Sequence, residues 1–311
     1  MQMRSWLIVA AILAVPADAA PTRFSEKVWI HGSEDCASNR DLPIDVLAFD
    51  ATTYVLRQNK CVHFEAPFIY VLIGDHTVFV QDTGATAEAD RFPLYQVVHD
   101  LVGQRERTTG KELRILVAHS HSHGDHTAGD AQFHGQPRVS LVEPTAEAVS
   151  KHFGFAQWPQ GRSTLDLGGR ALVFLPIPGH QEESLAVYDQ QTGWLLTGDT
   201  LYPGRLYVND WVEYKASIRR LVDFSRSHTI SAVMGTHIEM SATGELFPPG
   251  STYQPNEAPL ALTVGDLLLL NQRLDKSGDE PTELKMDKFA VVPIGTVQRM
   301  LGRILKALGV R

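Results

Sequence analysis

The chain has 311 residues, of which 43% are hydrophobic and 21% charged, and its formal net charge is −8. This length suits one large domain or two small ones, and the composition is that of a soluble globular protein. An acidic chain without a basic run argues against nucleic acid as a substrate.

The first predicted element is a signal peptide at residues 1–19. Arg4 gives a positive start, residues 6–15 are apolar, and Ala17-Asp18-Ala19 fits a small-x-small cleavage site before Ala20. The alternative, a membrane anchor, is disfavoured because this apolar run is too short to span a bilayer. We therefore expect a periplasmic or secreted protein without stable membrane insertion after cleavage.

Two cysteines, Cys36 and Cys61, lie early in the mature chain. In an exported protein they predict one disulfide that closes this loop, worth about 3 kcal/mol. Two free buried thiols are the alternative. Neither cysteine is near a histidine-rich segment in sequence, so we interpret the pair as structural rather than as metal ligands.

Alternating and apolar segments then predict strands and two helices in the first half of the chain. Residues 28–32 and 45–57 have an extended pattern, and a hairpin about Gly74-Asp75 joins predicted strands at 68–72 and 76–81. Residues 91–102 have helical spacing, with Pro93 tolerated in the first turn. A short buried strand follows at 113–117, and a helix is expected to open at Thr127.

The segment after that buried strand concentrates metal-binding side chains. Nine residues, Ala118 to His126, contain four histidines and an aspartate. Alternation along an extended chain places His121 and His123 on one side, and a tight turn at Gly124 brings the next two polar residues to face them. One short loop can therefore supply ligands to two adjacent ions. A histidine-rich loop without metal is the alternative, and the density of the motif disfavours it.

The second half alternates strands and helices. The predicted strands are 139–142, 170–177, 185–189, 194–197, 230–234 and 288–292, and the predicted helices are 144–153, 212–225, 260–274 and 297–308. Residues 247–259 are rich in Pro, Gly, Ser and Asn and predict a long surface loop. Interleaved strands and helices in both halves favour an α/β fold, an αββα sandwich of two mixed β-sheets packed face to face between helices.

Five ordered motifs together resemble those of the metallo-β-lactamase superfamily. They are Asp-Thr-Gly at 82–84, His-x-His-x-Asp-His at 121–126, Pro-Gly-His at 178–180, Thr-Gly-Asp-Thr at 197–200 and Gly-Thr-His at 235–237. The motifs cover residues 65–240. The resemblance implies a single domain of this fold over residues 20–311, with 241–311 as a C-terminal helical and loop extension.

The resemblance also implies a two-metal site for zinc, with manganese, iron or cobalt as alternatives. The implied ligands of the first ion are His121, His123 and His180, those of the second are Asp125, His126 and His237, and Asp199 bridges both. Asp82 is expected to orient a ligand loop. His119 has the same alternation but precedes the motif, so we interpret it as a packed or orienting residue.

The chemistry implied by such a site is hydrolysis of an acyl bond. A metal-bridging hydroxide, oriented by the catalytic residues Asp125 and Asp199, would attack a carbonyl carbon while the ions stabilise the oxyanion and the leaving group. Tyr202 and Tyr207, just past Asp199, could donate to the oxyanion, although packing is the commoner role of a tyrosine.

Asp199 also bears on which reaction is expected. It resembles the bridging carboxylate of the glyoxalase II, lactonase and esterase branches, which β-lactamases with the same metal loop generally lack. We therefore predict an exported dizinc hydrolase acting on a small-molecule ester, lactone or thioester. The alternatives are a β-lactamase, an iron-dependent persulfide dioxygenase and a non-catalytic metal-binding protein. Residues 181–184, Gln-Glu-Glu-Ser, depart from the family pattern.

Overall fold

The computed structural model describes residues 27–295. The predicted signal peptide (1–19) and the predicted helix at 297–308 lie outside these residues. Within the described part of the chain, no helix is both long enough and apolar enough to cross a membrane.

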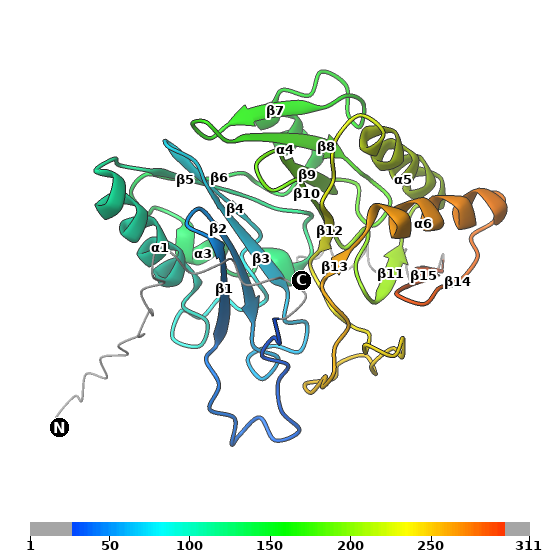
Figure 1. Ribbon diagram of the computed structural model, residues 1–311, viewed down its shortest axis with the longest axis horizontal. Coiled ribbons are helices and arrows are strands. Elements are labelled where there is room, and N and C mark those ends of the chain that lie inside the picture. Colours follow the sequence, from blue (N-terminus) through cyan, green and yellow to red (C-terminus); the bar gives the residue numbers. More distant parts are fainter. Residues whose placement is uncertain (1–26, 296–311) are drawn as a thin grey trace.

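Two six-stranded sheets form the centre of the molecule (Figure 1). The first sheet runs, in spatial order, β1 (Ile44–Asp50), β2 (Thr53–Gln58), β3 (Phe68–Ile73), β4 (Thr77–Gln81), β5 (Arg114–Ala118) and β6 (Val139–Leu141). The second runs β13 (Ala261–Leu262), β12 (Ala232–Gly235), β10 (Trp194–Gly198), β9 (Leu185–Asp189), β8 (Ala171–Pro176) and β7 (Ser163–Asp166). A smaller third sheet consists of β11 (Arg205–Val208), β15 (Ala290–Pro293) and β14 (Leu284–Lys285).

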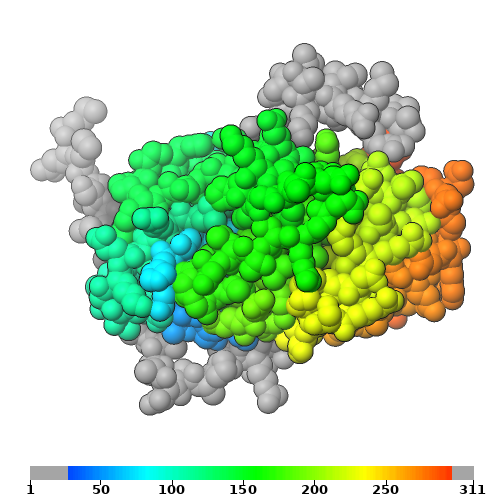
Figure 2. Space-filling model, turned by 90° about the horizontal axis from the view of Figure 1, so that it is seen from above, coloured from blue at the N-terminus to red at the C-terminus, as the bar shows by residue number. Residues whose placement is uncertain are grey.

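Helices cover the outer faces of both large sheets. α1 (Leu94–Thr109) and α3 (Asp130–Phe133) lie outside the first sheet, and α5 (Trp211–Ser225) and α6 (Val264–Lys276) outside the second (Figure 1). Two further helices, α2 (Gly124–Thr127) and α4 (Ala146–Phe153), lie in the connections. Viewed from above, residues of the first sheet and its helices (cyan) lie at one side, residues of the later part of the chain (yellow to orange) lie at the other, and residues of the middle of the chain (green) lie between them (Figure 2).

Alternation within single strands explains why three hydrophobic layers form. In β3, Phe68, Tyr70 and Leu72 face the space between the two sheets, while the intervening residues of this strand pack under α1. In β8, Leu172 and Phe174 face the same inter-sheet space, and their neighbours pack under α5 and α6. A strand buried on both faces requires a continuous apolar run, which is how these segments read. The predicted αββα architecture is confirmed.

Several predicted boundaries are wrong for local reasons. The extended segment 45–57 is a hairpin of β1 and β2, because the Asp50 carboxylate accepts from the N–H and hydroxyl of Thr52 and closes a turn. Helix α1 begins only after Pro93. The expected helix at 260–274 starts as strand β13, and Thr263 and Asp266 form a capping box that opens α6. Strands β7, β11 and β14 have no predicted counterpart.

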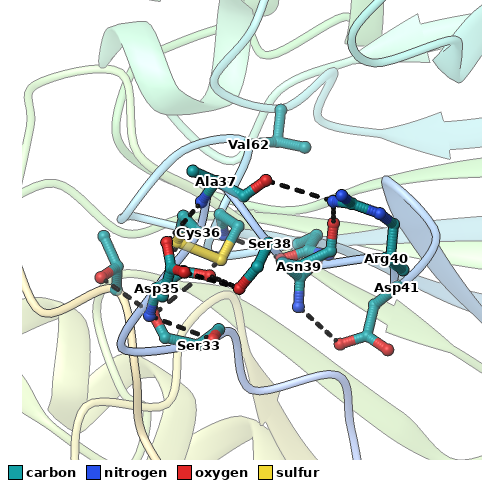
Figure 3. Close-up of a disulfide and its surroundings, with 12 residues drawn as sticks. Ser33, Asp35, Cys36, Ala37, Ser38, Asn39, Arg40, Asp41 and Val62 are labelled. Carbon is teal, nitrogen blue, oxygen red and sulfur yellow. Dashed lines mark hydrogen bonds between the residues drawn. A yellow bond between two sulfur atoms is a disulfide. The ribbon is translucent and has the colours of Figure 1, made fainter.

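The two cysteines are paired, as predicted: a disulfide joins Cys36 and Cys61, with their Cα atoms 5.1 Å apart (Figure 3). The alternative of two free thiols is wrong. The segment before Cys36 is also tied to the distant loop at 250–254, because the N–H of Ser33 donates to the carbonyl of Thr252 (3.1 Å). Residues 31–36, which we call the N-terminal strap, therefore connect the start of the domain to a loop more than 200 residues later.

Candidate metal centre

The predicted ligands lie where strands of both sheets end. β4 and β5 are parallel in the first sheet, and β10 and β12 are parallel in the second, so their carboxyl ends meet along one edge. Asp82 follows β4, the histidine-rich run follows β5, Asp199 follows β10 and His237 lies two residues beyond β12. His180 lies four residues after β8. The fold thus brings together side chains that are up to 155 residues apart.

Three imidazoles and one carboxylate form the first cluster. The Nε2 atoms of His121 and His180 are 3.2 Å apart, and Nδ1 of His123 lies 2.9 Å and 3.1 Å from them. Oδ2 of Asp199 is 3.7 Å from Nε2 of His121 and 3.6 Å from that of His180. Ligand atoms at about 2.0–2.1 Å around a tetrahedral zinc ion are about 3.3 Å from one another. The cluster therefore has the dimensions of one metal site.

A second cluster lies on the other side of Asp199. Nε2 of His126 and Nε2 of His237 are 3.3 Å apart, and Oδ2 of Asp125 is 3.2 Å and 3.3 Å from them. Oδ1 of Asp199 lies 3.5 Å from His126 and 3.3 Å from His237. All seven predicted ligands are thus brought together in two groups, and the two oxygens of Asp199 face one group each.

The protonation of the first cluster fits cation binding. Burial lowers the pKa of His121 well below its usual value and that of His123 to about 3, so both imidazoles are neutral, as metal binding requires. In the second cluster burial opposes protonation of His126 and His237, but the Asp125 and Asp199 carboxylates outweigh it and raise the pKa of His126 well above its usual value and that of His237 to about 9. The same pairing holds the pKa of both carboxyls well below the usual range. A divalent metal in the second cluster would therefore displace the imidazole protons when it binds.

Every ligand imidazole is also fixed through its outward-facing nitrogen. Asp82 accepts from Nδ1 of His126 (3.0 Å) and from the N–H of Ser120 (2.6 Å). Its predicted role, orienting the ligand loop, matches these contacts. The remaining outward partners are the Ser120 hydroxyl for His121, the Gln181 side chain for His123, the Tyr207 carbonyl for His180 and the Glu65 carbonyl for His237.

The structure places the other predicted residues outside the two clusters. Nε2 of His119 contacts Oδ1 of Asp130 (2.8 Å), so His119 ties the ligand loop to α3 and does not face either cluster. The hydroxyl of Tyr202 is buried and donates to the carbonyl of Arg205. Tyr207 is half-buried beside the clusters and is the remaining candidate for oxyanion contact.

The expected helix start at Thr127 is wrong. Helix α2 begins at Gly124, because the N–H of His126 donates to the carbonyl of His123 (3.0 Å) and that of Ala128 to Gly124 (2.9 Å). Asp125 and His126 therefore lie on a helical turn rather than on an extended loop. The carboxylate of Asp125 in this first turn is the favourable charge for a helix start.

A pocket of about 410 Å³ opens onto both clusters. Its walls combine the clusters with residues from the first sheet's connections, the third sheet and the loop after β12. They include Lys60, Phe64, Glu65, His123, Asp125, His180, Asp199, Tyr202, Arg205, Tyr207, Asn209, His237, Glu239, Pro248, Pro249, Gly250, Ser251, Gln254 and Ile294. This volume suits a small-molecule substrate.

The family model of the metallo-beta-lactamase superfamily matches residues 64–259, and the chain belongs to this superfamily. It is 25% identical over 223 residues to the human acyl-coenzyme A thioesterase MBLAC2, covering 60% of this chain and 77% of that protein. It is also 30% identical over 95 residues to a hydroxyacylglutathione hydrolase of Synechococcus, covering 30% of this chain and 37% of that protein. Membership of the superfamily, with hydrolases among the relatives, confirms the prediction of a metal-dependent hydrolase.

Solved structures agree on the fold. The metallo-beta-lactamase FIM-1 from Pseudomonas aeruginosa aligns with a TM-score of 0.50 at 13% identity, covering 78% of this chain and 99% of that chain. At this identity the likeness concerns the fold alone.

Proposed function

We propose that the chain is an exported dinuclear-zinc hydrolase that cleaves an ester, lactone or thioester, with thioesters as the first class to test. The observation that carries the proposal is the position of the Asp199 carboxylate, one oxygen in each cluster. The names of two relatives, an acyl-coenzyme A thioesterase and a hydroxyacylglutathione hydrolase, support testing thioesters before the other acyl bonds. Export rests on the N-terminal pattern and accords with the disulfide.

The residues divide the work of such a reaction. His121, His123 and His180 would hold one zinc ion, and Asp125, His126 and His237 the other. When bound, the ions would supply an activated water and Lewis acidity toward the carbonyl oxygen. The ionised carboxylates of Asp125 and Asp199 would orient the attacking water, because each oxygen accepts a hydrogen bond at a fixed place.

Two residues of this chain support the reaction from beside the clusters. Tyr207 lines the pocket, and the pKa of its hydroxyl is raised chiefly by burial, so the hydroxyl is protonated and able to donate at neutral pH. The Asp82 carboxylate keeps the imidazole of His126 in one tautomer through the hydrogen bond at Nδ1. These contacts set the geometry before substrate arrives.

The test combines metal analysis of the mature protein with a substrate panel of thioesters, aryl esters, acyl-homoserine lactones and nitrocefin. We expect two zinc ions per chain and hydrolysis of acyl substrates, thioesters fastest. Asp199→Ala should lower zinc content and reduce kcat/KM at least about a hundredfold, whereas Asp90→Ala, an exposed control, should change neither. Equal activity of wild type and Asp199→Ala on every substrate would overturn the proposal. Nitrocefin as the best substrate, or bound iron with oxygen consumption, would establish the β-lactamase or dioxygenase alternative instead.

A further inference from the structure

One wall of the pocket contains a buried cation. Lys60 follows β2, is 3% exposed and lines the pocket together with residues of both metal clusters. Its ammonium donates to the carbonyl of Phe64 (2.8 Å). Within residues 27–295, no carboxylate forms an ion pair with this ammonium. Two of its three protons are therefore available to a ligand in the pocket.

Arg57, Glu257, Glu239 and Glu65 are the charged groups near Lys60. Arg57 is buried in a bidentate ion pair with Glu257. Oε2 of Glu239 accepts from the N–H of Arg205 (2.9 Å) and from a tyrosine hydroxyl. Glu65 lines the same pocket, and burial raises the pKa of its carboxyl. Burying an ammonium without an ion-pair partner is unfavourable. Burial, reinforced by Arg57, lowers the pKa of Lys60 to about 8, which leaves the side chain mostly cationic at neutral pH.

A second polar group on the pocket wall also has no partner. Gln254 is 3% exposed, lines the pocket, and its Oε1 atom makes no hydrogen bond within the described residues. Buried side-chain amides are almost always hydrogen-bonded, so the unpaired amide oxygen of this pocket-lining residue is a group that a ligand can satisfy. Rotating the terminal amide by 180° exchanges its oxygen and nitrogen, which lets Gln254 donate there instead.

The segments that carry the two residues are held by the same packing. A Cβ on Gly32 would lie 1.9 Å from the carbonyl of Thr252 and 2.8 Å from Cβ of Lys60, so Gly32 packs tightly between these two segments. The N–H of Gln254 donates to the carbonyl of His31 (3.0 Å). Lys60 itself directly precedes Cys61 of the disulfide, whose surroundings Figure 3 shows. The strap thus holds the backbone of both residues in place before any ligand binds, as a binding site requires.

We propose that Lys60, with Gln254, binds a carboxylate group of the substrate, so that the enzyme acts on acyl compounds that carry a negative charge. This inference rests on the proposed function, since it assigns the substrate class of the same pocket. A thioester substrate can carry this carboxylate on its acyl half or on its thiol half, and the substrate pairs below distinguish the two.

Two matched substrate pairs distinguish these halves. The first pair is the glutaryl thioester of N-acetylcysteamine and its methyl ester, which differ in charge only in the acyl half. The second pair is S-acetyl-3-mercaptopropionate and its methyl ester, which differ only in the thiol half. We expect wild-type enzyme to favour the anionic member of one pair by roughly 10- to 100-fold in kcat/KM, since a hydrogen bond to a charged group contributes about that much.

Lys60→Met should remove this preference by raising KM for the anionic member more than for the neutral member, with a smaller effect on kcat. Gln254→Leu should weaken the preference in the same direction. Lys111→Met, which removes an exposed lysine paired with Asp75, is the control and should change nothing. If Lys60→Met affects both members of each pair equally, or neither, the inference is wrong.

Binding separates a failure of this inference from a failure of the proposed function. Should none of the substrates be hydrolysed, glutarate binding to the metal-loaded proteins is measured by calorimetry. Glutarate that binds wild type at least about tenfold more tightly than Lys60→Met upholds the anion site without the reaction. Equal affinities overturn it. Thermal unfolding of each variant establishes that it is folded.

Discussion

The outward nitrogens of the five ligand imidazoles decide which lone pair faces the clusters. Sequence reasoning found one of these partners, Asp82, because a carboxylate at a strand end is a visible signal. It missed the carbonyls of Glu65 and Tyr207, because every residue has a backbone carbonyl and the residue type does not indicate which carbonyl accepts a hydrogen bond. Gln181 could have been found: it stands where the chain departs from the family pattern, and its side chain contacts Nε2 of His123 (2.6 Å).

Lys60 leads to a prediction about stability and pH. Its pKa is about 8 in the folded protein and near 10.5 when unfolded, so the unfolded chain binds more protons between these values. The free energy of unfolding should therefore rise as pH increases from 8 to 10.5, and the penalty below pH 8 is at most about 3 kcal/mol. We expect Lys60→Met to unfold at a higher temperature than wild type at pH 7.

Measuring the thermal midpoints of both proteins at pH 7 and pH 10 tests this. The advantage of Lys60→Met should be largest at pH 7 and shrink at pH 10, where wild-type Lys60 is mostly neutral. An advantage of the same size at both pH values, or its absence at pH 7, would show that the buried lysine is not a destabilising charge.

At the scale of elements, the predictable strands were those buried on both faces. Residues 68–72, 185–189 and 194–197 read as continuous apolar runs, and each lies within a strand of the structure. β7 and β11 were missed because they are short, and parts of both remain accessible to solvent. Their pairing is decided by distant partners, such as β15 for β11, which local pattern does not reveal.

The N-terminal strap leads to the second prediction. Replacing both Cys36 and Cys61 by serine should lower the free energy of unfolding by about 3 kcal/mol, because the disulfide closes a loop of 25 residues and restricts the unfolded chain. Metal content should stay the same, since every predicted ligand lies on other elements. Denaturant unfolding with metal analysis measures both. A variant that loses metal while keeping wild-type stability would contradict this view of the strap.

For the molecule as a whole, one buried side chain links the two large sheets. Arg170 precedes β8 in the second sheet, where it pairs with Asp189 of β9 (2.7 Å). The same guanidinium donates to the Thr52 carbonyl (2.7 Å) and to the Thr53 hydroxyl (3.0 Å), which belong to the turn and strand of the first sheet. The sequence pattern predicted that the two sheets pack face to face, but it did not predict this polar connection between them.

Arg170→Met is expected to destabilise the protein by about 3–5 kcal/mol, because it leaves the Asp189 carboxylate buried without a counter-charge, although Gln191 and Thr192 still donate hydrogen bonds to it. The double variant Arg170→Met/Asp189→Leu should recover part of the loss, since it removes the unpaired charge as well. Chemical denaturation of the three proteins gives the comparison. A double variant less stable than Arg170→Met would show that the carboxylate acts through other contacts.

The Asp199 carboxylate couples the geometry of the two clusters. It reaches the first cluster, built mainly from the loop after β5 and from the turn at His180, with one oxygen, and the second cluster with the other. Because the carboxylate is planar and rigid, its two oxygens cannot move independently. A rotation that brings one oxygen closer to its cluster moves the other oxygen away from the second cluster. The two oxygens are only about 2 Å apart in one rigid carboxylate. A displacement of Asp199 toward one cluster therefore changes its distance to the other cluster at the same time.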